Sequence, residues 1–131
     1  MSMETPLHRV QGLGPAHAGV KHFWRERVTA AALVPLSIWF AWAVLGLVGA
    51  NEPQVLTFLA RSSFGVPLNA ILLGAFIVIM VYHMALGLQV VIEDYVHGEG
   101  AKIFLLLATR AFGVAIVAVC VYALLSIARA V

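Results

Sequence analysis

Charged residues and cysteines are both scarce in this sequence. Charged residues make up 11% of the 131 residues and hydrophobic residues 63%, whereas an ordinary soluble domain is about 25% charged. A chain of this length has no room for a soluble catalytic core beside a membrane-embedded part. The single cysteine, Cys120, excludes a disulfide framework or a thiolate metal site within the chain and is typical of a buried, inert thiol. The composition therefore predicts an integral membrane protein.

Sequence patterns that carry enzyme chemistry are also missing. The sequence contains no glycine-rich phosphate loop, no zinc-ligand spacing and no nucleophile–base arrangement. The formal net charge of +2 is small and argues against nucleic acid as a partner. The chain is therefore not expected to catalyse a reaction alone, although it can be a subunit of an enzyme.

Three apolar segments are long enough to cross a bilayer core of about 30 Å, which takes roughly 20 residues of helix. These segments predict helices at about 28–48, 68–92 and 103–127. Continuous runs of this length indicate helices rather than the short alternating strands of a membrane barrel. We therefore expect an all-α protein with three transmembrane helices, in which Asn69 and Gln89 make hydrogen bonds between helices.

Residues 1–27 are polar, and glycines and a proline between positions 12 and 19 interrupt any helical periodicity. We expect an irregular cytoplasmic segment that lies over one membrane face, followed by a transmembrane domain at 28–131. A cleaved signal peptide is not expected, because the first apolar run is longer than the roughly 7 to 15 residues of a signal sequence.

Basic residues are unevenly divided between the two predicted sides of the membrane. One side carries five, Arg9, Lys21, Arg25, Arg27 and Lys102, and the other carries two, Arg61 and Arg129. Cytoplasmic loops carry the excess of lysine and arginine. This bias predicts a cytoplasmic or matrix N-terminus in a bacterial or mitochondrial inner membrane. Three spans then place Val131 on the opposite side.

The second predicted helix carries polar groups at two depths. His83 and Asp94 are eleven residues apart, which corresponds to about 16 Å of helix and a difference in direction of roughly 20°. His83 is therefore expected near mid-membrane and Asp94 at the cytoplasmic interface, on one face of the helix. Gly87 lies about 40° round on the same face, and Tyr95 about 120° away.

A histidine inside a membrane predicts a functional site. Three uses fit His83: ligation of haem iron, a polar contact between helices, or a proton relay. Gly87 would leave clearance for a flat macrocycle, or would let another helix approach. Haem with two histidine ligands would need a partner membrane subunit, because the other histidines all lie in predicted cytoplasmic segments, at His8, His17, His22 and His97.

The remaining polar residues near this helix can be interpreted from position and chemistry. Tyr95 is expected to be an interfacial aromatic anchor beside a solvated Asp94. Arg110, inside the third predicted helix, can extend its guanidinium to the interface, or it can neutralise a haem propionate or Asp94. Arg25 is expected to be a surface charge that docks another subunit or lipid phosphates.

Taken together, these motifs resemble the hydrophobic membrane anchor of succinate dehydrogenase, which is respiratory complex II. The resemblance rests on His83-x-x-x-Gly87 followed by Asp94-Tyr95 at the end of the second of three helices. The stretch HFWRERVTAAALVPLSIWF is similar to that family's entry into its first helix, at Trp24, Arg25, Arg27, Thr29 and Ala30. The resemblance covers nearly the whole chain from Lys21 onward.

The resemblance implies that His83 supplies one axial ligand to a haem b shared with the larger cytochrome b anchor subunit. It also implies that Tyr95 hydrogen-bonds ubiquinone, that Asp94 lies in the same pocket, and that Arg27 lies near the haem propionates and the quinone. The other implied partners are the flavoprotein and iron–sulfur subunits, on the cytoplasmic or matrix face. Two alternatives remain: the anchor subunit of a fumarate reductase, and a haem-free structural membrane protein that assembles with partners.

Overall fold

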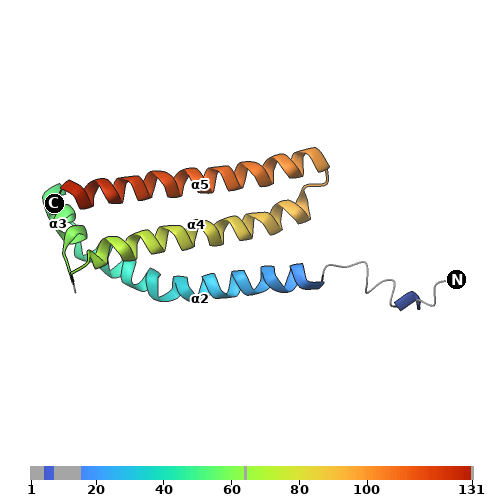
Figure 1. Ribbon diagram of the computed structural model, residues 1–131, viewed down its shortest axis with the longest axis horizontal. Coiled ribbons are helices and arrows are strands. Elements are labelled where there is room, and N and C mark those ends of the chain that lie inside the picture. Colours follow the sequence, from blue (N-terminus) through green and yellow to red (C-terminus); the bar gives the residue numbers. More distant parts are fainter. Residues whose placement is uncertain (1–4, 8–15, 64, 131) are drawn as a thin grey trace.

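The computed structural model describes residues 5–7, 16–63 and 65–130 (Figure 1). Its long helices are α2 (Ala16–Gly46), α4 (Leu68–Tyr95) and α5 (Glu99–Ala130), and the short α3 (Glu52–Ala60) joins α2 to α4. The segments Gly19–Gly46, Leu68–Tyr95 and Glu99–Ile127 are long and apolar enough to cross a membrane. The expected all-α fold with three membrane-spanning helices is confirmed.

The first helix begins at Ala16, so the prediction of an irregular chain up to residue 27 is wrong for residues 16–27. A single interior glycine costs a helix only about 1 kcal/mol, and Gly19 is exposed, with nothing near its Cα to disturb. His22 and Glu26 also meet one turn apart, at 3.6 Å between Nε2 and Oε1. The predicted irregular stretch at residues 8–15 lies outside the described residues, as do the side chains of His8, Arg9, His17 and Arg129.

The turn between α4 and α5 is shorter than predicted, because α4 runs to Tyr95 and α5 starts at Glu99. Lys102 closes the turn by donating a hydrogen bond from Nζ to the Glu93 carbonyl, at 2.9 Å. This bond satisfies one of the carbonyl groups that the end of a helix leaves without a partner. The polar end of α4 is therefore held to the start of α5.

The short helix α3 was not predicted from the sequence. Asn51 and Gln54 form a reciprocal capping box at its start, with bonds of 3.1 and 3.0 Å. The Asn69 side chain donates to the Phe58 carbonyl at 2.8 Å and so ties α4 to α3, which confirms its predicted role between helices. The same prediction is wrong for Gln89, which donates to Glu93 of its own helix at 2.8 Å.

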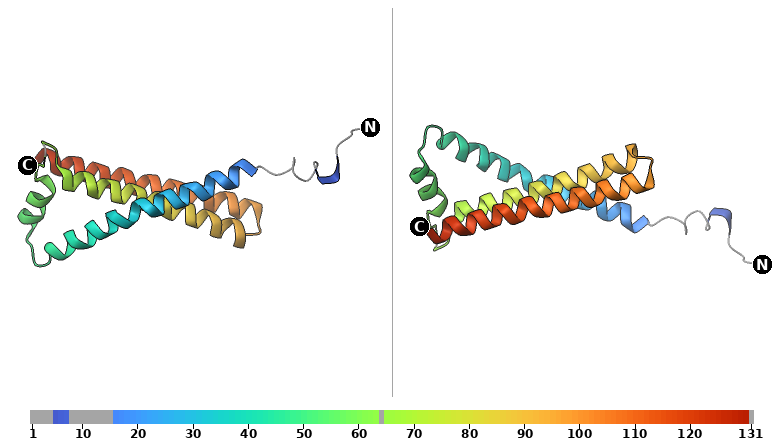
Figure 2. Two further views of the ribbon diagram at one scale, coloured as in Figure 1. Left: turned by 90° about the horizontal axis from the view of Figure 1, so that it is seen from below. Right: turned by 90° about the horizontal axis from the view of Figure 1, so that it is seen from above.

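Helix α4 lies between the other two long helices (Figure 1). Helices α2 and α5 both pack against α4 rather than against each other, and α2 crosses the α4–α5 pair obliquely (Figure 2). Phe40 stacks on Phe76 across the α2–α4 contact, with ring centroids 4.7 Å apart. At the α4–α5 contact, an added Cβ on Gly113 would lie 3.3 Å from Val81 Cγ1. A small residue thus lets these two helices approach closely.

The start of α2 and the α4–α5 turn lie at one end of the molecule, whereas α3 and the end of α5 lie at the other (Figure 1). Lys21, Arg25, Arg27 and Lys102 therefore share one end, opposite Arg61. This arrangement matches the predicted division of charges. Which end faces the cytoplasm or matrix stays a prediction.

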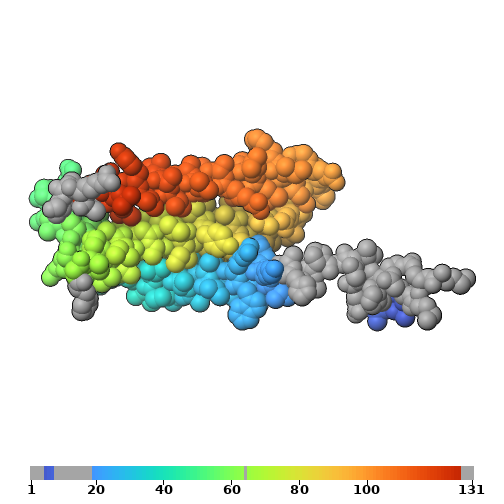
Figure 3. Space-filling model, in the orientation of Figure 1, coloured from blue at the N-terminus to red at the C-terminus, as the bar shows by residue number. Residues whose placement is uncertain are grey.

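The molecule is long and thin, so few of its side chains are interior (Figure 3). Six hydrophobic residues are buried among the described residues: Ala43, Leu59, Phe76, Val81, Leu86 and Ile92. Cys120 is half-buried rather than buried as predicted, because α5 has only one neighbouring long helix. The apolar surface that remains exposed is suited to lipid and to partner subunits.

Candidate functional site

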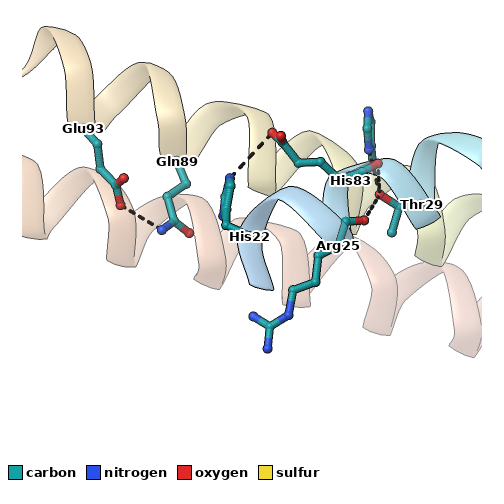
Figure 4. Close-up of polar contacts among 7 residues, drawn as sticks. His22, Arg25, Thr29, His83, Gln89 and Glu93 are labelled. Atoms are coloured by element: carbon teal, nitrogen blue, oxygen red, sulfur yellow. Dashed lines mark hydrogen bonds and ion pairs between the residues drawn. The ribbon is translucent and has the colours of Figure 1, made fainter. Parts of the chain in front are cut away.

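His83 on α4 faces α2, where it meets Thr29 (Figure 4). The imidazole is half-buried, and its Nδ1 lies 2.8 Å from Thr29 Oγ1. The Thr29 hydroxyl also lies 2.7 Å from the carbonyl oxygen of Arg25 and 3.1 Å from that of Glu26, one turn earlier in α2. A polar contact between helices, one of the three uses predicted for this histidine, is therefore present. It occupies one of the two ring nitrogens.

Nε2 of His83 makes no hydrogen bond or ion pair within the part of the chain that the structure describes. Gly87, one turn further along α4, is exposed, and a Cβ added there would meet nothing within 4 Å. The described chain therefore does not cover the side of α4 on which His83 Nε2 and Gly87 lie. These two residues fit a flat iron-containing macrocycle, which needs one free imidazole nitrogen and clearance beside it.

Asp94 and Tyr95 end α4, and both side chains are exposed. The Tyr95 side chain is 77% exposed, and neither it nor Asp94 makes a hydrogen bond or ion pair with other described residues. Their neighbour Glu93 is held by Gln89 and Lys102. The chain therefore presents a phenol and a carboxyl group on a fixed helix end without enclosing them.

Arg27 does not face the Thr29–His83 contact. Its guanidinium lies over the ring of Phe23, with 5.0 Å between Cζ and the ring centroid. Two residues along a helix correspond to a rotation of about 200°, so Arg27 and Thr29 project from opposite sides of α2. Arg25, one turn before Thr29, lies on the same side of α2, and its guanidinium extends away from the imidazole (Figure 4).

Arg110 lines an open cavity of about 890 Å³ between α4 and α5. The cavity is mainly apolar, and Arg25 and Gln89 are among its polar lining residues. Val81 and Ala85 also line it. Because each is two residues from His83, they lie on the side of α4 opposite the imidazole. The lining of this cavity does not include His83, and no ion pair joins Arg110 to Asp94 among the described side chains.

The contact between Thr29 and His83 was missed from the sequence. The two residues lie at matching depth, because Thr29 is thirteen residues from the start of α2 and His83 is twelve from the end of α4. Both distances correspond to about 18 to 20 Å of helix, measured from the same end of the bundle. The sequence predicted that the first helix starts at residue 28, which would put Thr29 at the membrane surface. Thr29 was therefore not expected at the depth of His83.

Comparison with known proteins gives a consistent set of relatives. Residues 1–127 match the family model described as Succinate dehydrogenase/Fumarate reductase transmembrane subunit. The chain is 33% identical to the succinate dehydrogenase hydrophobic membrane anchor subunit of Paracoccus denitrificans over 120 residues. This alignment covers 92% of this chain and 88% of that protein. It is 32% identical over 100 residues to the succinate dehydrogenase membrane anchor subunit of Reclinomonas americana, covering 76% of this chain and 81% of that protein. No solved structure matches the chain.

Proposed function

The chain belongs to the succinate dehydrogenase/fumarate reductase transmembrane subunit family, and from this membership we propose that it is the membrane anchor subunit of a succinate:ubiquinone oxidoreductase. The observation that carries the proposal is the arrangement of polar groups on α4. This helix is long and apolar enough to cross a membrane; it carries His83 near its middle and Asp94 and Tyr95 at its end. The chain would anchor the catalytic subunits and contribute residues to their electron path.

His83 would supply one axial ligand of haem b through Nε2, and Gly87 would leave clearance for the macrocycle. The support is the half-buried imidazole with one satisfied nitrogen and the open space beside the glycine. Haem bound here would supply a one-electron redox centre within the membrane. The second axial histidine would come from the larger cytochrome b anchor subunit, because His22 and His97 lie near helix ends in this chain.

Tyr95 and Asp94 would form one wall of the ubiquinone site. The phenol would donate a hydrogen bond to a quinone carbonyl and stabilise the negative charge that develops as electrons arrive. Asp94 would stand at the water-accessible side of the same pocket, where protons enter. The support is their shared position at the helix end and their lack of partners within the described chain. Partner subunits would complete the pocket.

Neither arginine that was predicted near the haem propionates or the quinone gains support from the geometry. Arg27 lies over Phe23, and Arg110 lines the α4–α5 cavity, whose lining does not include His83, Asp94 or Tyr95. The proposed haem and quinone contacts of this chain therefore rest on His83, Gly87, Asp94 and Tyr95.

The catalytic flavoprotein and iron–sulfur subunits would dock at the end of the bundle formed by the start of α2 and the α4–α5 turn. Lys21 and Lys102 lie at that end, and Arg25 and Arg27 lie in the same half of the bundle. An excess of these residues marks the cytoplasmic side, or its matrix equivalent, of an inner membrane. Tyr95 is at the same end. The proposed quinone wall would therefore lie on the side of the membrane where the docked subunits stand.

A second candidate is the anchor of a fumarate reductase, because the family description covers both enzymes. The relatives from Paracoccus denitrificans and Reclinomonas americana carry the dehydrogenase name. Comparing the rates of succinate oxidation and fumarate reduction in the purified complex would separate the two. A haem-free assembly role is a third candidate, and an absorption spectrum of the complex would decide it.

The decisive test is a reduced-minus-oxidised absorption spectrum of the chain purified with its natural partner subunits. We expect a b-type band in the wild type that is lost or altered in His83→Leu. His97→Leu is the matched control, because His97 is exposed in the turn between α4 and α5. The b-type band per assembled complex should be unchanged in this variant, even if fewer complexes assemble. A fully assembled wild-type complex without a b-type band would overturn the haem proposal.

A further inference from the structure

We propose that Thr29 is a positioning residue that fixes the tautomer and ring orientation of His83, so that Nε2 is the nitrogen presented to haem iron. This inference rests on the haem ligation proposed above. It concerns a residue of α2 that touches the imidazole and would act on the iron only through it.

The tautomer of His83 follows from where the hydroxyl hydrogen of Thr29 points. A threonine hydroxyl carries one hydrogen and can accept from other donors, whereas a backbone carbonyl can only accept. Thr29 Oγ1 is 2.7 Å from the Arg25 carbonyl oxygen, and two oxygens at that separation need a hydrogen between them. The Thr29 hydrogen therefore points to Arg25, with the Glu26 carbonyl as a second acceptor 3.1 Å from Oγ1.

With its hydrogen committed to α2, Thr29 Oγ1 can only accept at its 2.8 Å contact with His83 Nδ1. Nδ1 must then carry the ring hydrogen. In a neutral imidazole the other nitrogen has no hydrogen and keeps a lone pair. The backbone of α2 thus selects, through Thr29, the tautomer whose Nε2 can bind a metal.

The same chain of hydrogen bonds would tune the ligand. A metal-binding histidine that donates its second N–H is held in orientation and becomes a more basic ligand. A more basic imidazole stabilises ferric iron relative to ferrous iron and lowers the midpoint potential of the haem. Removing the Thr29 hydroxyl should therefore raise the potential and weaken haem retention, by roughly tenfold to a hundredfold in affinity.

Another threonine in this chain provides a matched control. Thr57 Oγ1 donates to the carbonyl oxygen of Pro53 one turn earlier, at the same 2.7 Å, but it contacts no ring nitrogen. Both threonines thus make a hydrogen bond to a carbonyl of their own helix. The contact with an imidazole distinguishes Thr29.

The experiment compares the wild-type complex, assembled with its partner subunits, with Thr29→Val, Thr29→Ala, Thr29→Ser and Thr57→Val. The readouts are haem per assembled complex after challenge with apomyoglobin, which extracts weakly held haem, and the midpoint potential from a redox titration. We expect Thr29→Val and Thr29→Ala to lose haem faster and to titrate at a more positive potential. Thr29→Ser, which keeps the hydroxyl, and Thr57→Val should match the wild type.

The possible failures are distinguishable. A wild-type complex that assembles without haem b overturns the haem proposal and this inference with it. If the wild type holds haem and Thr29→Val or Thr29→Ala titrates at the wild-type potential, the positioning role is overturned while haem ligation stands. If Thr29→Ser shifts as far as Thr29→Val, the hydroxyl is not the cause, and the inference is likewise overturned. Should Thr29→Val fail to assemble, Thr29→Ala against Thr29→Ser gives the same decision.

Discussion

The candidate functional residues in the middle and at the end of α4 differ in burial and in hydrogen bonding. In the middle, the His83 ring is half-buried and held by Thr29 of α2. At the end, Tyr95 is 77% exposed and makes no hydrogen bond with other described residues. The chain thus arranges its proposed haem ligand by itself but leaves its proposed quinone wall to be completed by other subunits. Changes in the middle should alter haem binding, whereas changes at the end should alter only the assembled enzyme.

Tyr95→Phe should give the largest effect and would test the independence of the two regions. Loss of one hydrogen-bond donor to a developing charge lowers a rate by about 100-fold or more. We expect that loss in succinate-to-ubiquinone electron transfer, with the haem spectrum unchanged and succinate oxidation by a soluble artificial acceptor retained. Tyr122→Phe is the matched control, because Tyr122 on α5 is 74% exposed. Equal loss with both acceptors would indicate failed assembly instead of a quinone role.

Gly87→Leu would sharpen the comparison from the middle of α4. The chain itself has room for a side chain there, so the substitution should leave the three helices intact. Overpacking a close contact costs about 1 to 3 kcal/mol, which should lower the affinity of the assembled complex for haem by roughly tenfold or more and so reduce its haem content. Gly46→Leu is the control, because Gly46 also has open space around it and lies at the end of α2, away from the proposed docking surface. Haem content equal to that of wild type in Gly87→Leu would contradict the proposed clearance role.

Arg110→Leu should give the smallest effect, because the α4–α5 cavity that Arg110 lines does not include His83, Asp94 or Tyr95. We expect unchanged haem content, measured by the b-type band per assembled complex, and an unchanged rate of quinone reduction. A loss of either would show that the two sides of α4 are coupled. It would also restore the predicted contact of Arg110 with a propionate or the quinone.

The number and order of the spanning helices could be predicted from the sequence, because hydropathy over about 20 residues is a strong signal. The start of the first helix could not, because the prediction equated polar residues with irregular chain. A helix can continue past its apolar stretch with exposed charged side chains, as α2 does at Lys21 and Arg25. Because the start of the first helix was predicted wrongly, the contact between Thr29 and His83 was also missed.

Side-chain partners were harder to predict than helices. Asn69 and Gln89 are both amides in an apolar helix, and the same interhelical role was expected of each. Gln89 instead has Glu93 one turn along its own helix, a spacing at which side chains meet directly. Asn69, near the start of α4, reaches the Phe58 carbonyl of α3, and α3 itself was not foreseen. The positions of His83, Gly87, Asp94 and Tyr95 along α4 could be predicted, because they depend only on the spacing of residues in one helix. Their roles stay predictions.

The contact between Thr29 and His83 has a consequence for the order of synthesis. It joins the first two membrane-spanning helices of the chain, α2 and α4, and requires nothing from α5. A ribosome completes those two helices before it begins the third. The ring of His83 can therefore be oriented while α5 is still being translated. The proposed haem ligand of this chain would then be in position before haem and the histidine of the partner subunit bind.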